Sequence, residues 1–369
     1  MFEKLQKQLD RRKSENSFRE LKSKNGLVDF CSNDYLGIAR LLNVNVTDAV
    51  GSTGSRLLQG NYALIEGLED DLADFHKSGS ALVYNSGYVG NIGLFSAIPQ
   101  KGDVIFYDEF IHASVKDGMR LSFAKSFSFK HNDVEDLEKK YLKLQDEISG
   151  DVFVAVESVY SMDGDKSPLV ELVELSKRRH FALVVDEAHA VGVYGNNGEG
   201  LVQALGLEDE VAIRLVTFGK ALGCHGAAVL ASGLIKEYLV NFSRSFIYST
   251  ALPPMAVRVI KDAYSFMRTN EQNKLLQKNI MYFKVAADAN NLKGLISSDS
   301  AVQCIVIPGN KESKKSSEYL QEKGFDVRAI LSPTVPLGSE RLRICIHSFN
   351  TETEIDELIL NLSTIKNIK

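Results

Sequence analysis

The sequence predicts an α/β protein, with a three-layer large domain around a mostly parallel seven-stranded sheet and a smaller α+β domain at the C-terminal end. Three observations support this prediction. From residue 65 onward, helical patterns alternate with short apolar runs. These runs lack polar–apolar alternation, which is typical of strands buried on both faces of a parallel sheet between layers of helices. The rhythm ends near residue 250, where Leu252-Pro-Pro-Met interrupts it.

Residues 1–40 are expected to form a separate N-terminal segment. A charged amphipathic helix is predicted for residues 1–25, because their apolar side chains share one face of a helix. These side chains are Phe2, Leu5 and Leu9. Leu27–Leu36 then indicates a short strand and turn, and the glycine-rich stretch Gly51–Gly60 indicates a loop.

The large domain is expected over residues 41–252. Short apolar runs that alternate with helical patterns indicate βαβ units and hence a parallel sheet. The predicted strands are Ser80–Tyr84, Asp103–Tyr107, Lys125–Phe129, Asp151–Val156, Phe181–Val185, Ile213–Phe218 and Gly226–Ala231.

The C-terminal domain is expected over residues 253–369. A long helix is predicted from about Pro254 to Asn290, and a closing helix is predicted to begin near Asn350 and Thr351. The apolar stripe of the closing helix comprises Ile355, Leu358, Ile359 and Leu362. Between the two helices, strands are predicted at Val302–Ile307, Phe325–Ala329 and Leu342–Ile346.

Composition and charge exclude several classes of protein. The chain has 369 residues, 44% of them hydrophobic and 25% charged, which is a usual globular balance. A net charge of −5 argues against a dedicated nucleic-acid or membrane-surface binder. No stretch reaches the roughly 18 apolar residues of a membrane span. The N-terminus lacks the apolar core of a signal peptide.

The four cysteines predict a protein of a reducing compartment. They are far apart and include no CxxC pair, at Cys31, Cys224, Cys304 and Cys345. This spacing favours reduced thiols over a disulfide set or a zinc site. We therefore expect a cytoplasmic protein that binds no metal.

Lys220 is the residue around which the predicted chemistry is organised. It is the only cation between Leu215 and Cys224, at a point where a buried strand gives way to a glycine-flanked loop. An amine beside apolar surface readily lowers its pKa, which suits Schiff-base chemistry. The alternative is an ordinary surface lysine in a turn.

Asp186 ends an apolar strand, where a carboxylate is costly to bury unless a cation pairs with it. One interpretation is that it keeps a cofactor nitrogen protonated. A charge pair at about 4 Å is worth roughly 4 kcal/mol at an effective dielectric near 20, or about three pKa units. A carboxylate that caps the next helix is the alternative. A helicase-type Asp-Glu-Ala-His box is rejected, because no phosphate loop GxxxxGK[ST] accompanies it.

Other polar residues follow the strands at their carboxyl ends, where open α/β sheets bind ligands. Asn85-Ser-Gly87 opens a helix whose N–H groups suit a phosphate. His112 follows another strand, with a structural hydrogen bonder as the alternative. Arg341 and Arg343 alternate along one strand face, where one of them suits a clamp on a carboxylate. The alternative is a pair of solvated surface arginines.

Taken together, these segments resemble the α-oxoamine synthase family of fold-type I pyridoxal-phosphate (PLP) enzymes. The resemblance runs from about Asp29 to Arg343, which is most of the chain. The motifs that carry it are Ser32-Asn-Asp-Tyr-Leu-Gly37, Asn85-Ser-Gly-Tyr88, His112-Ala-Ser114, Ser161-Met-Asp-Gly-Asp165, Asp186-Glu-Ala-His189, Thr217-Phe-Gly-Lys220 and Ser249-Thr-Ala-Leu-Pro-Pro254.

The resemblance implies a role for each of these residues. Lys220 would form the Schiff base with PLP, Asp186 would pair with the pyridinium nitrogen, and His112 would stack on the ring. His189 would reach the ring oxygen. The rest of the cofactor pocket would comprise Ser86, Gly87, Tyr88, Ser161, Thr217 and, reaching the phosphate of the neighbouring subunit in a homodimer, Thr250. Arg343 would grip the amino-acid carboxylate, with Asn33 and Arg19 at the substrate mouth.

The resemblance also implies an activity, the decarboxylative condensation of an amino acid with an acyl thioester. The motifs look most like the branch that makes 8-amino-7-oxononanoate for biotin from L-alanine and a pimeloyl thioester of coenzyme A or acyl-carrier protein. Sister condensations of glycine, as in glycine C-acetyltransferase and 5-aminolevulinate synthase, use the same catalytic residues. The resemblance is also compatible with a catalytically silent partner subunit or with an aminotransferase. In one departure, Leu331 stands where a basic residue can stand in the biotin branch.

Overall fold

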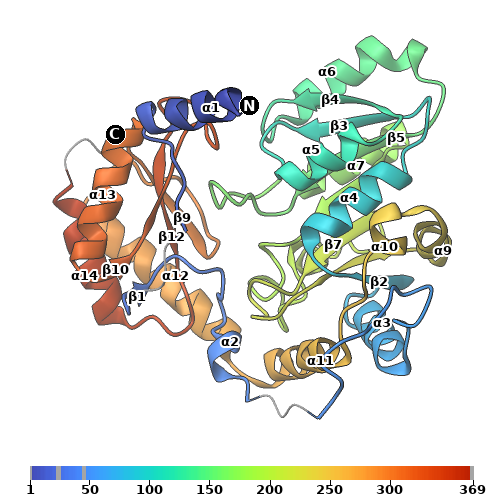
Figure 1. The fold of residues 1–369 in the computed structure, drawn as a ribbon. Coiled ribbons are helices and arrows are strands. Elements are labelled where there is room, and N and C mark those ends of the chain that lie inside the picture. Colours follow the sequence, from blue (N-terminus) through green and yellow to red (C-terminus); the bar gives the residue numbers. More distant parts are fainter. Residues whose placement is uncertain (1, 22–25, 44–46, 366–369) are drawn as a thin grey trace. The chain divides into compact units, whose positions relative to one another are not determined.

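The computed structural model describes residues 2–21, 26–43 and 47–365, which fold into two compact units (Figure 1). The large unit comprises Leu36–Tyr160 and Lys166–Asn273, and the small unit comprises Met1–Tyr35, Ser161–Asp165 and Lys274–Lys369. These bounds differ from the three predicted segments. The N-terminal residues join the small unit because a strand within them pairs with a strand near residue 325.

The large unit is built on a seven-stranded sheet of order β2-β8-β7-β6-β5-β3-β4. Its strands are β2 (Ser80–Tyr84), β3 (Val104–Asp108), β4 (Lys125–Phe129), β5 (Val152–Glu157), β6 (Ala182–Asp186), β7 (Ile213–Thr217) and β8 (Ala227–Ala231). Only β8 runs against its neighbours, and the other pairs are parallel. The prediction of a mostly parallel seven-stranded sheet is confirmed.

Each of the seven strands lies within one residue of its predicted bounds, because the apolar runs are the parts buried between layers. All six residues of β5 are buried. The neighbours β5 and β6 each extend one residue further than predicted, since Glu157 pairs with Asp186 in register. That extension places a carboxylate at the last ladder position of β6.

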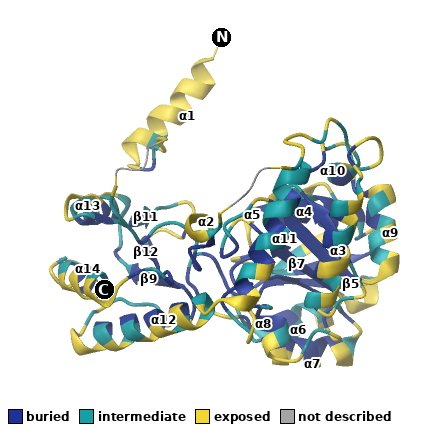
Figure 2. Cartoon of the chain, turned by 90° about the horizontal axis from the view of Figure 1, so that it is seen from below, coloured by how far each residue is buried: buried dark blue, intermediate teal, exposed yellow. Residues whose placement is uncertain are grey.

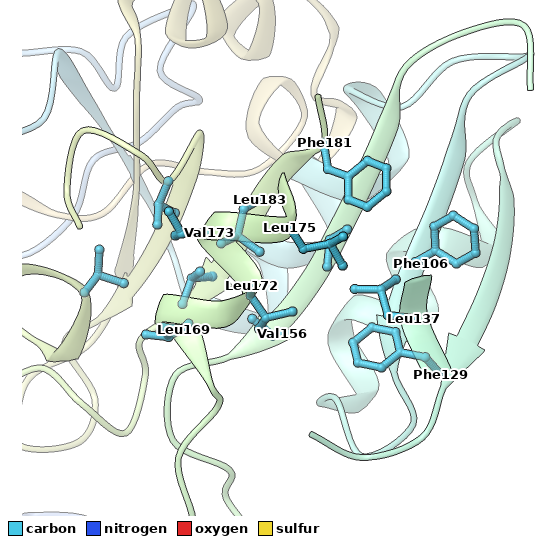
Figure 3. Packing of buried hydrophobic residues seen from close by; sticks show 14 of the residues in the cluster. Phe106, Phe129, Leu137, Val156, Leu169, Leu172, Val173, Leu175, Phe181 and Leu183 are labelled. Atoms are coloured by element: carbon cyan, nitrogen blue, oxygen red, sulfur yellow. The ribbon is translucent and has the colours of Figure 1, made fainter. Parts of the chain in front are cut away.

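Helices cover both faces of this sheet, which gives the predicted three layers. They are α3 (Ala63–Phe75), α4 (Gly87–Ala97), α5 (Ala113–Arg120), α6 (Val134–Leu144), α7 (Leu169–Arg179), α9 (Gly233–Phe242) and α11 (Pro254–Thr269), with the short α2 (Ile38–Leu41), α8 (Leu201–Ala204) and α10 (Arg244–Ile247) and a 3₁₀ turn at Gln145–Glu147. Alternate residues of β5 face opposite layers. Val154 and Val156 pack with α6 and α7, whereas Phe153 and Ala155 pack with α4, α5 and α9. Figure 3 shows Val156 within the first of these clusters.

The small unit is an α+β fold. Its helices are α1 (Glu3–Ser14), most of α12 (Gln272–Ala289), α13 (Asn310–Glu322) and α14 (Glu352–Ser363). A three-stranded antiparallel sheet has the order β11 (Arg328–Ile330), β12 (Arg341–Cys345) and β9 (Val302–Val306). A separate parallel pair joins β1 (Val28–Asp29) to β10 (Phe325–Asp326). Thr351 caps α14 with a capping box, which confirms the predicted start of that helix.

Three predictions of element bounds are wrong. The long helix predicted from Pro254 to Asn290 is two helices, since Asn270 is extended at φ −116° and ψ 156°. The strand predicted at Phe325–Ala329 is divided between β10 and β11. The N-terminal helix ends at Ser14, and Asn16 follows with a positive φ of 53°. Residues 22–25 of that prediction lie outside the described residues.

Burial differs along the described chain, as Figure 2 shows. The central strands of the large unit are buried, whereas α1 has no buried residue. No helix in the described part of the chain is long and apolar enough to cross a membrane. All four cysteines are free thiols, as their spacing predicts.

Candidate active site

The large unit gathers three predicted site residues near the carboxyl ends of its strands. Asp186 ends β6, His112 follows β3, and Lys220 follows β7. These three strands run in the same direction, so their carboxyl ends share one edge of the sheet. Hydrogen bonds through Asn91 and Ser114 join Asp186 to His112. The charges of Asp186 and Lys220 both act on the pKa of His112.

Asp186 is held in one orientation by two hydrogen-bond donors. The residue is only 7% exposed. Oδ1 accepts a hydrogen bond from the main-chain N–H of Ala188 at 2.9 Å, and Oδ2 accepts one from Asn91 Nδ2 at 2.8 Å. Both donors are neutral, so these hydrogen bonds supply no cationic partner for the carboxylate, and the site suits a cationic ring nitrogen.

His112 caps the N-terminus of α5. Its Nδ1 lies 2.7 Å from Ser114 Oγ and accepts a hydrogen bond from the main-chain N–H of Ser114 at 3.3 Å. Desolvation lowers the pKa of His112, the negative charge of Asp186 opposes this change, and the positive charge of Lys220 adds to it. The imidazole is therefore biased toward its neutral form.

A tight loop presents Lys220 at the end of β7. The main-chain N–H of Cys224 donates to the carbonyl of Phe218 at 2.7 Å, and that of Gly223 donates to the carbonyl of Lys220 at 2.8 Å. Gly223 has a positive φ of 62°, and a Cβ atom there would lie 2.4 Å from the backbone nitrogen of Ala39. The glycine therefore lets the loop close while Lys220 stays half-buried.

The start of α4 and the end of β7 form the remaining part of the predicted cofactor pocket. Ser86 caps α4 by accepting a hydrogen bond from the N–H of Val89, and Gly87 allows close approach to Thr217. A Cβ atom on Gly87 would lie 2.6 Å from Thr217 Cγ2. Thr217 Oγ1 is buried and has no hydrogen-bond partner among the described residues. An unsatisfied hydroxyl beside a helix N-terminus suits a phosphate.

Three other predicted cofactor residues, Tyr88, His189 and Thr250, differ in their exposure and in their partners. The hydroxyl of Tyr88 donates to Asp117, and its ring meets that of His112 edge-on at 6.4 Å between centroids. His189 is 5% exposed, three residues beyond Asp186. Thr250 is exposed, and its carbonyl accepts a hydrogen bond from Asn85 Nδ2 at 2.7 Å.

These residues fit PLP. The buried carboxylate of Asp186 suits the ring nitrogen, the unpaired Thr217 hydroxyl suits an oxygen of the cofactor, and Lys220 supplies an amine. The imidazole of His112 supplies a flat surface beside the carboxylate.

The small unit holds the predicted carboxylate clamp. Nε of Arg343 donates to the carbonyl of Ser161 at 2.8 Å, and Nη2 donates to Asn33 Oδ1 at 3.0 Å. Nη1 lies 3.0 Å from Cys345 Sγ. Burial raises the pKa of the Cys345 thiol to about 11, so this partner is neutral near pH 7.

Arg343 forms no ion pair with a carboxylate in the described parts of the chain, whereas its neighbour Arg341 does. Arg341 is 5% exposed and pairs with Asp163. The interpretation of both as solvated surface arginines is wrong for Arg341. Because the partners of Arg343 are neutral, its charge is available to an anionic ligand.

The third predicted substrate residue, Arg19, has a different partner. It is exposed, and its Nη2 donates to Thr334 Oγ1 at 3.3 Å. Asn33 also accepts a hydrogen bond from the hydroxyl of Tyr35 at 3.1 Å. The structure therefore joins Asn33 to Arg343 and leaves Arg19 in a separate contact.

Sequence reasoning missed two residues of the large unit, Asn91 and Ser114. Both lie within motifs that the sequence displays, but neither stands directly after a strand. Asn91 is a buried polar residue in the otherwise apolar helix α4. That single amide in an apolar helix was the available signal.

Comparison with known proteins agrees with a PLP site. The family described as aminotransferase class I and II matches residues 25–362. A relative from Emericella nidulans, named 8-amino-7-oxononanoate synthase, is 42% identical over 91% of this chain and 89% of its own length.

Two solved structures share the fold over nearly the whole chain. 8-Amino-7-oxononanoate synthase from Francisella tularensis is 30% identical with a TM-score of 0.77, covering 92% of this chain and 98% of that one. A structure of SPT, serine palmitoyltransferase, with PLP is 26% identical with a TM-score of 0.89, covering 99% and 97%.

Proposed function

The chain belongs to the aminotransferase class I and II family, and within it to the PLP-dependent α-oxoamine synthases, and we propose that it condenses L-alanine with a pimeloyl thioester. The products are 8-amino-7-oxononanoate, carbon dioxide and the free thiol of coenzyme A or acyl-carrier protein. This reaction belongs to biotin synthesis, and we place it in the cytoplasm. The name of the relative from Emericella nidulans supports the choice of product.

The observation that carries the proposal is the convergence of Asp186, His112 and Lys220 in the large unit, together with the Arg343 cation in the small unit. PLP, when bound, supplies an electron sink for negative charge that develops at the substrate Cα.

Asp186 acts by keeping the ring nitrogen protonated. Its carboxylate is fixed by the N–H of Ala188 and the amide of Asn91, so its charge is oriented before any ligand binds. His112 would lie against the ring face, and Thr217 with the first turn of α4 would hold the phosphate. His189 would contact the ring oxygen, and Ser161 would lie near it.

Lys220 acts as the general base. In the proposal its amine would first hold the cofactor and would be released when the amino group of L-alanine takes its place. The freed amine would then remove the Cα proton of L-alanine from a fixed position. The new carbon–carbon bond forms as the thiol of the carrier departs. The carboxylate then leaves as carbon dioxide, and a proton returns to Cα.

Arg343 acts on the amino-acid carboxylate. Its neutral partners Asn33 and Cys345 orient the guanidinium without neutralising it. A bidentate contact of this kind fixes the substrate through its only anionic group. Leu331 supplies no cation to assist, so Arg343 carries this task with Asn33 and, at the substrate mouth, Arg19.

The proposal includes a homodimer in which Thr250 reaches the phosphate in the neighbouring subunit. Its exposure in the described chain is consistent with a contact of that kind. Sedimentation equilibrium of the PLP-loaded protein tests the dimer, and a monomer with full activity would rule it out.

Product analysis tests the choice of substrates. The purified protein is incubated with PLP, L-[1-¹³C]alanine and pimeloyl coenzyme A, and the products are identified by mass spectrometry. We expect 8-amino-7-oxononanoate without the label and labelled carbon dioxide. Exclusive turnover of glycine with acetyl or succinyl coenzyme A would move the assignment to a sister condensation.

A second candidate is favoured by the structural likeness to serine palmitoyltransferase. It predicts turnover of L-serine with a long-chain acyl thioester by the same catalytic residues. An incubation of L-serine with palmitoyl coenzyme A distinguishes the two, since the proposal predicts no product from that pair.

A further inference from the structure

A continuous hydrogen-bonded chain joins Asp186 to His112 through Asn91 and Ser114. Asn91 Nδ2 lies 2.8 Å from Asp186 Oδ2 and 3.0 Å from Ser114 Oγ. Ser114 Oγ lies 2.7 Å from His112 Nδ1. Asn91 is 2% exposed and Ser114 is 0% exposed, so bulk water does not compete for these bonds.

The direction of each bond follows from one main-chain donor. The N–H of Ser114 can only donate, and its acceptor is His112 Nδ1 at 3.3 Å. Nδ1 therefore carries no proton, and the Ser114 hydroxyl must also donate to it. The oxygen of that hydroxyl is then the acceptor for Asn91.

Asn91 can take only one amide orientation in this chain. Its Nδ2 carries two hydrogens, which serve the Asp186 carboxylate and the Ser114 hydroxyl. The reverse orientation would place the carbonyl oxygen of Asn91 against a carboxylate oxygen, with no proton between them. The bond to an ionised carboxylate is of the stronger, charge-assisted kind.

We propose that Asn91 is a positioning residue, which orients the Asp186 carboxylate and, through Ser114, holds His112 as the neutral tautomer protonated at Nε2. The inference rests on the proposed function for what these two side chains contact, the ring nitrogen and the ring face. It goes beyond that function by making the two contacts interdependent.

The charged groups around His112 agree with this tautomer. They are Asp186, Lys220 and Asp117, of which the carboxylates raise the pKa of His112 and the ammonium lowers it. Desolvation is the largest influence and also lowers the pKa. The neutral imidazole that accepts two hydrogen bonds at Nδ1 is thus the favoured form.

Nitrogen NMR of the histidine rings tests the tautomer directly. The seven histidines are labelled with ¹⁵N, and the His112 signals are assigned by their loss in His112→Gln. Spectra are recorded near pH 7 with and without PLP. We expect His112 to carry its proton at Nε2 in both states. A proton at Nδ1 would overturn the proposal, whatever the substrate of the enzyme.

Two variants distinguish the Asp186 end of the hydrogen-bonded chain from its His112 end. Asn91→Leu keeps the branched shape and removes both donors, so we expect loss of the single tautomer and a roughly tenfold rise in the Kd for PLP. Ser114→Ala removes only the link to His112, so the tautomer signal should weaken while the Kd for PLP stays within about twofold. Ser114→Thr retains the hydroxyl and should restore the wild-type spectrum.

Matched controls exclude a general loss of structure. Ser176→Ala removes a buried serine hydroxyl in α7, on the other face of the sheet, and should change neither reading. Asn279→Ala removes a buried amide in the small unit, where it donates to the carbonyls of His347 and Asn350. It should lower stability without changing the His112 tautomer.

Two results would overturn the role of Asn91. One is an Asn91→Leu protein that is folded by circular dichroism and has unchanged PLP affinity and an unchanged His112 spectrum. If that variant does not fold, an unchanged spectrum in Ser114→Ala decides against the proposal. If the enzyme does not turn over L-alanine, the His112 spectrum and the Kd for PLP still test the role of Asn91. The proposed function and the role of Asn91 can therefore fail separately.

Discussion

The candidate sites of the two units are built in opposite ways. In the large unit, Asp186 ends a strand and His112 and Lys220 each follow one, and strands of one direction bring them to a common edge. In the small unit, Arg343 is joined to Ser161 and Asn33, which are 182 and 310 residues away in the sequence. The first site depends on sheet topology, and the second depends on long-range contacts.

The two sites also differ in charge. The large unit combines a carboxylate and an amine whose charges both act on the pKa of the His112 imidazole. The small unit surrounds the Arg343 guanidinium with neutral partners, since burial raises the pKa of Cys304 to about 12 and that of Cys345 to about 11. The comparison teaches that one site is arranged to tune proton positions and the other to leave a cation available.

Lys220→Ala should produce the largest effect and act on the large-unit site alone. Because the amine is both the anchor of the cofactor and the proposed base, we expect turnover to fall by at least roughly 10³-fold. The visible absorbance of the PLP-loaded protein should disappear in the same variant. Steady-state kinetics and an absorbance spectrum measure both, and an active Lys220→Ala protein would end the account.

Asp186→Asn should retain some PLP and lose most of the rate. The neutral amide no longer keeps the ring nitrogen protonated, so we expect kcat to fall by roughly 10²-fold. A fluorescence titration with PLP measures retention, and stopped-flow kinetics measures the rate. A near-normal rate would show that another group is the partner of the ring nitrogen.

Arg343→Met and Arg341→Met should separate binding from stability in the small unit. Loss of the Arg343 contact should raise the KM for the amino acid by roughly 10- to 100-fold, in line with about 1.5–3 kcal/mol for hydrogen bonds to charged groups. Loss of Arg341 leaves Asp163 buried without its partner, at a cost of about 3 kcal/mol or more.

Urea unfolding and steady-state kinetics on both arginine variants distinguish these outcomes. The account predicts a KM effect for Arg343→Met and a stability effect for Arg341→Met. An exchange of the two effects would reverse the assignment of the carboxylate clamp.

The smallest expected effect concerns Glu187, the neighbour of Asp186 that faces the core. Burial raises the pKa of Glu187 to about 7, against the opposing N–H of Val202 and the charge of Arg214. The folded protein therefore binds more protons than the unfolded chain between the unfolded pKa and about pH 7. Stability should fall as the pH rises through this window and level off above it.

Glu187→Gln removes this titration. Urea unfolding of the variant and the wild type at pH 5 and pH 8 measures the difference. We expect the free energy of unfolding of Glu187→Gln, taken relative to that of the wild type, to be higher at pH 8 than at pH 5. A difference that is the same at both pH values would show that Glu187 does not titrate in this range.

The large-unit site was largely predictable from the sequence, and the reason is local. A buried strand is a continuous apolar run, so its end can be located within one residue, and the polar residue after it becomes a candidate. Asn91 was not predicted as a site residue because it lies inside a helix, where a polar residue is usually solvated. Only the fold shows that the amide of Asn91 is buried and meets Asp186.

In the small-unit site, the alternation of Arg341 and Arg343 along a strand predicted a carboxylate clamp. The choice of Arg343 and its association with Asn33 came only from the family resemblance. Nothing in the spacing of Asn33, Ser161 and Arg343 indicates that they meet, since each belongs to a different segment of the chain. Tyr35 and Cys345 were not predicted as partners of Arg343, because a tyrosine and a cysteine in an apolar strand are usually residues of the hydrophobic core. The break at Asn270 was also missed, since apolar periodicity continues across it in the sequence.

Exchange of the Cα proton in heavy water tests the central claim most directly, because it reports the Lys220 base, the Asp186 charge and the Arg343 clamp before any thioester reacts. PLP-loaded protein is offered L-alanine, glycine and L-serine in turn, each with and without pimeloyl thioester, and exchange is followed by NMR. The account predicts the fastest exchange with L-alanine, stimulation by the thioester, and no exchange in Lys220→Ala. Absence of exchange with all three amino acids would contradict it.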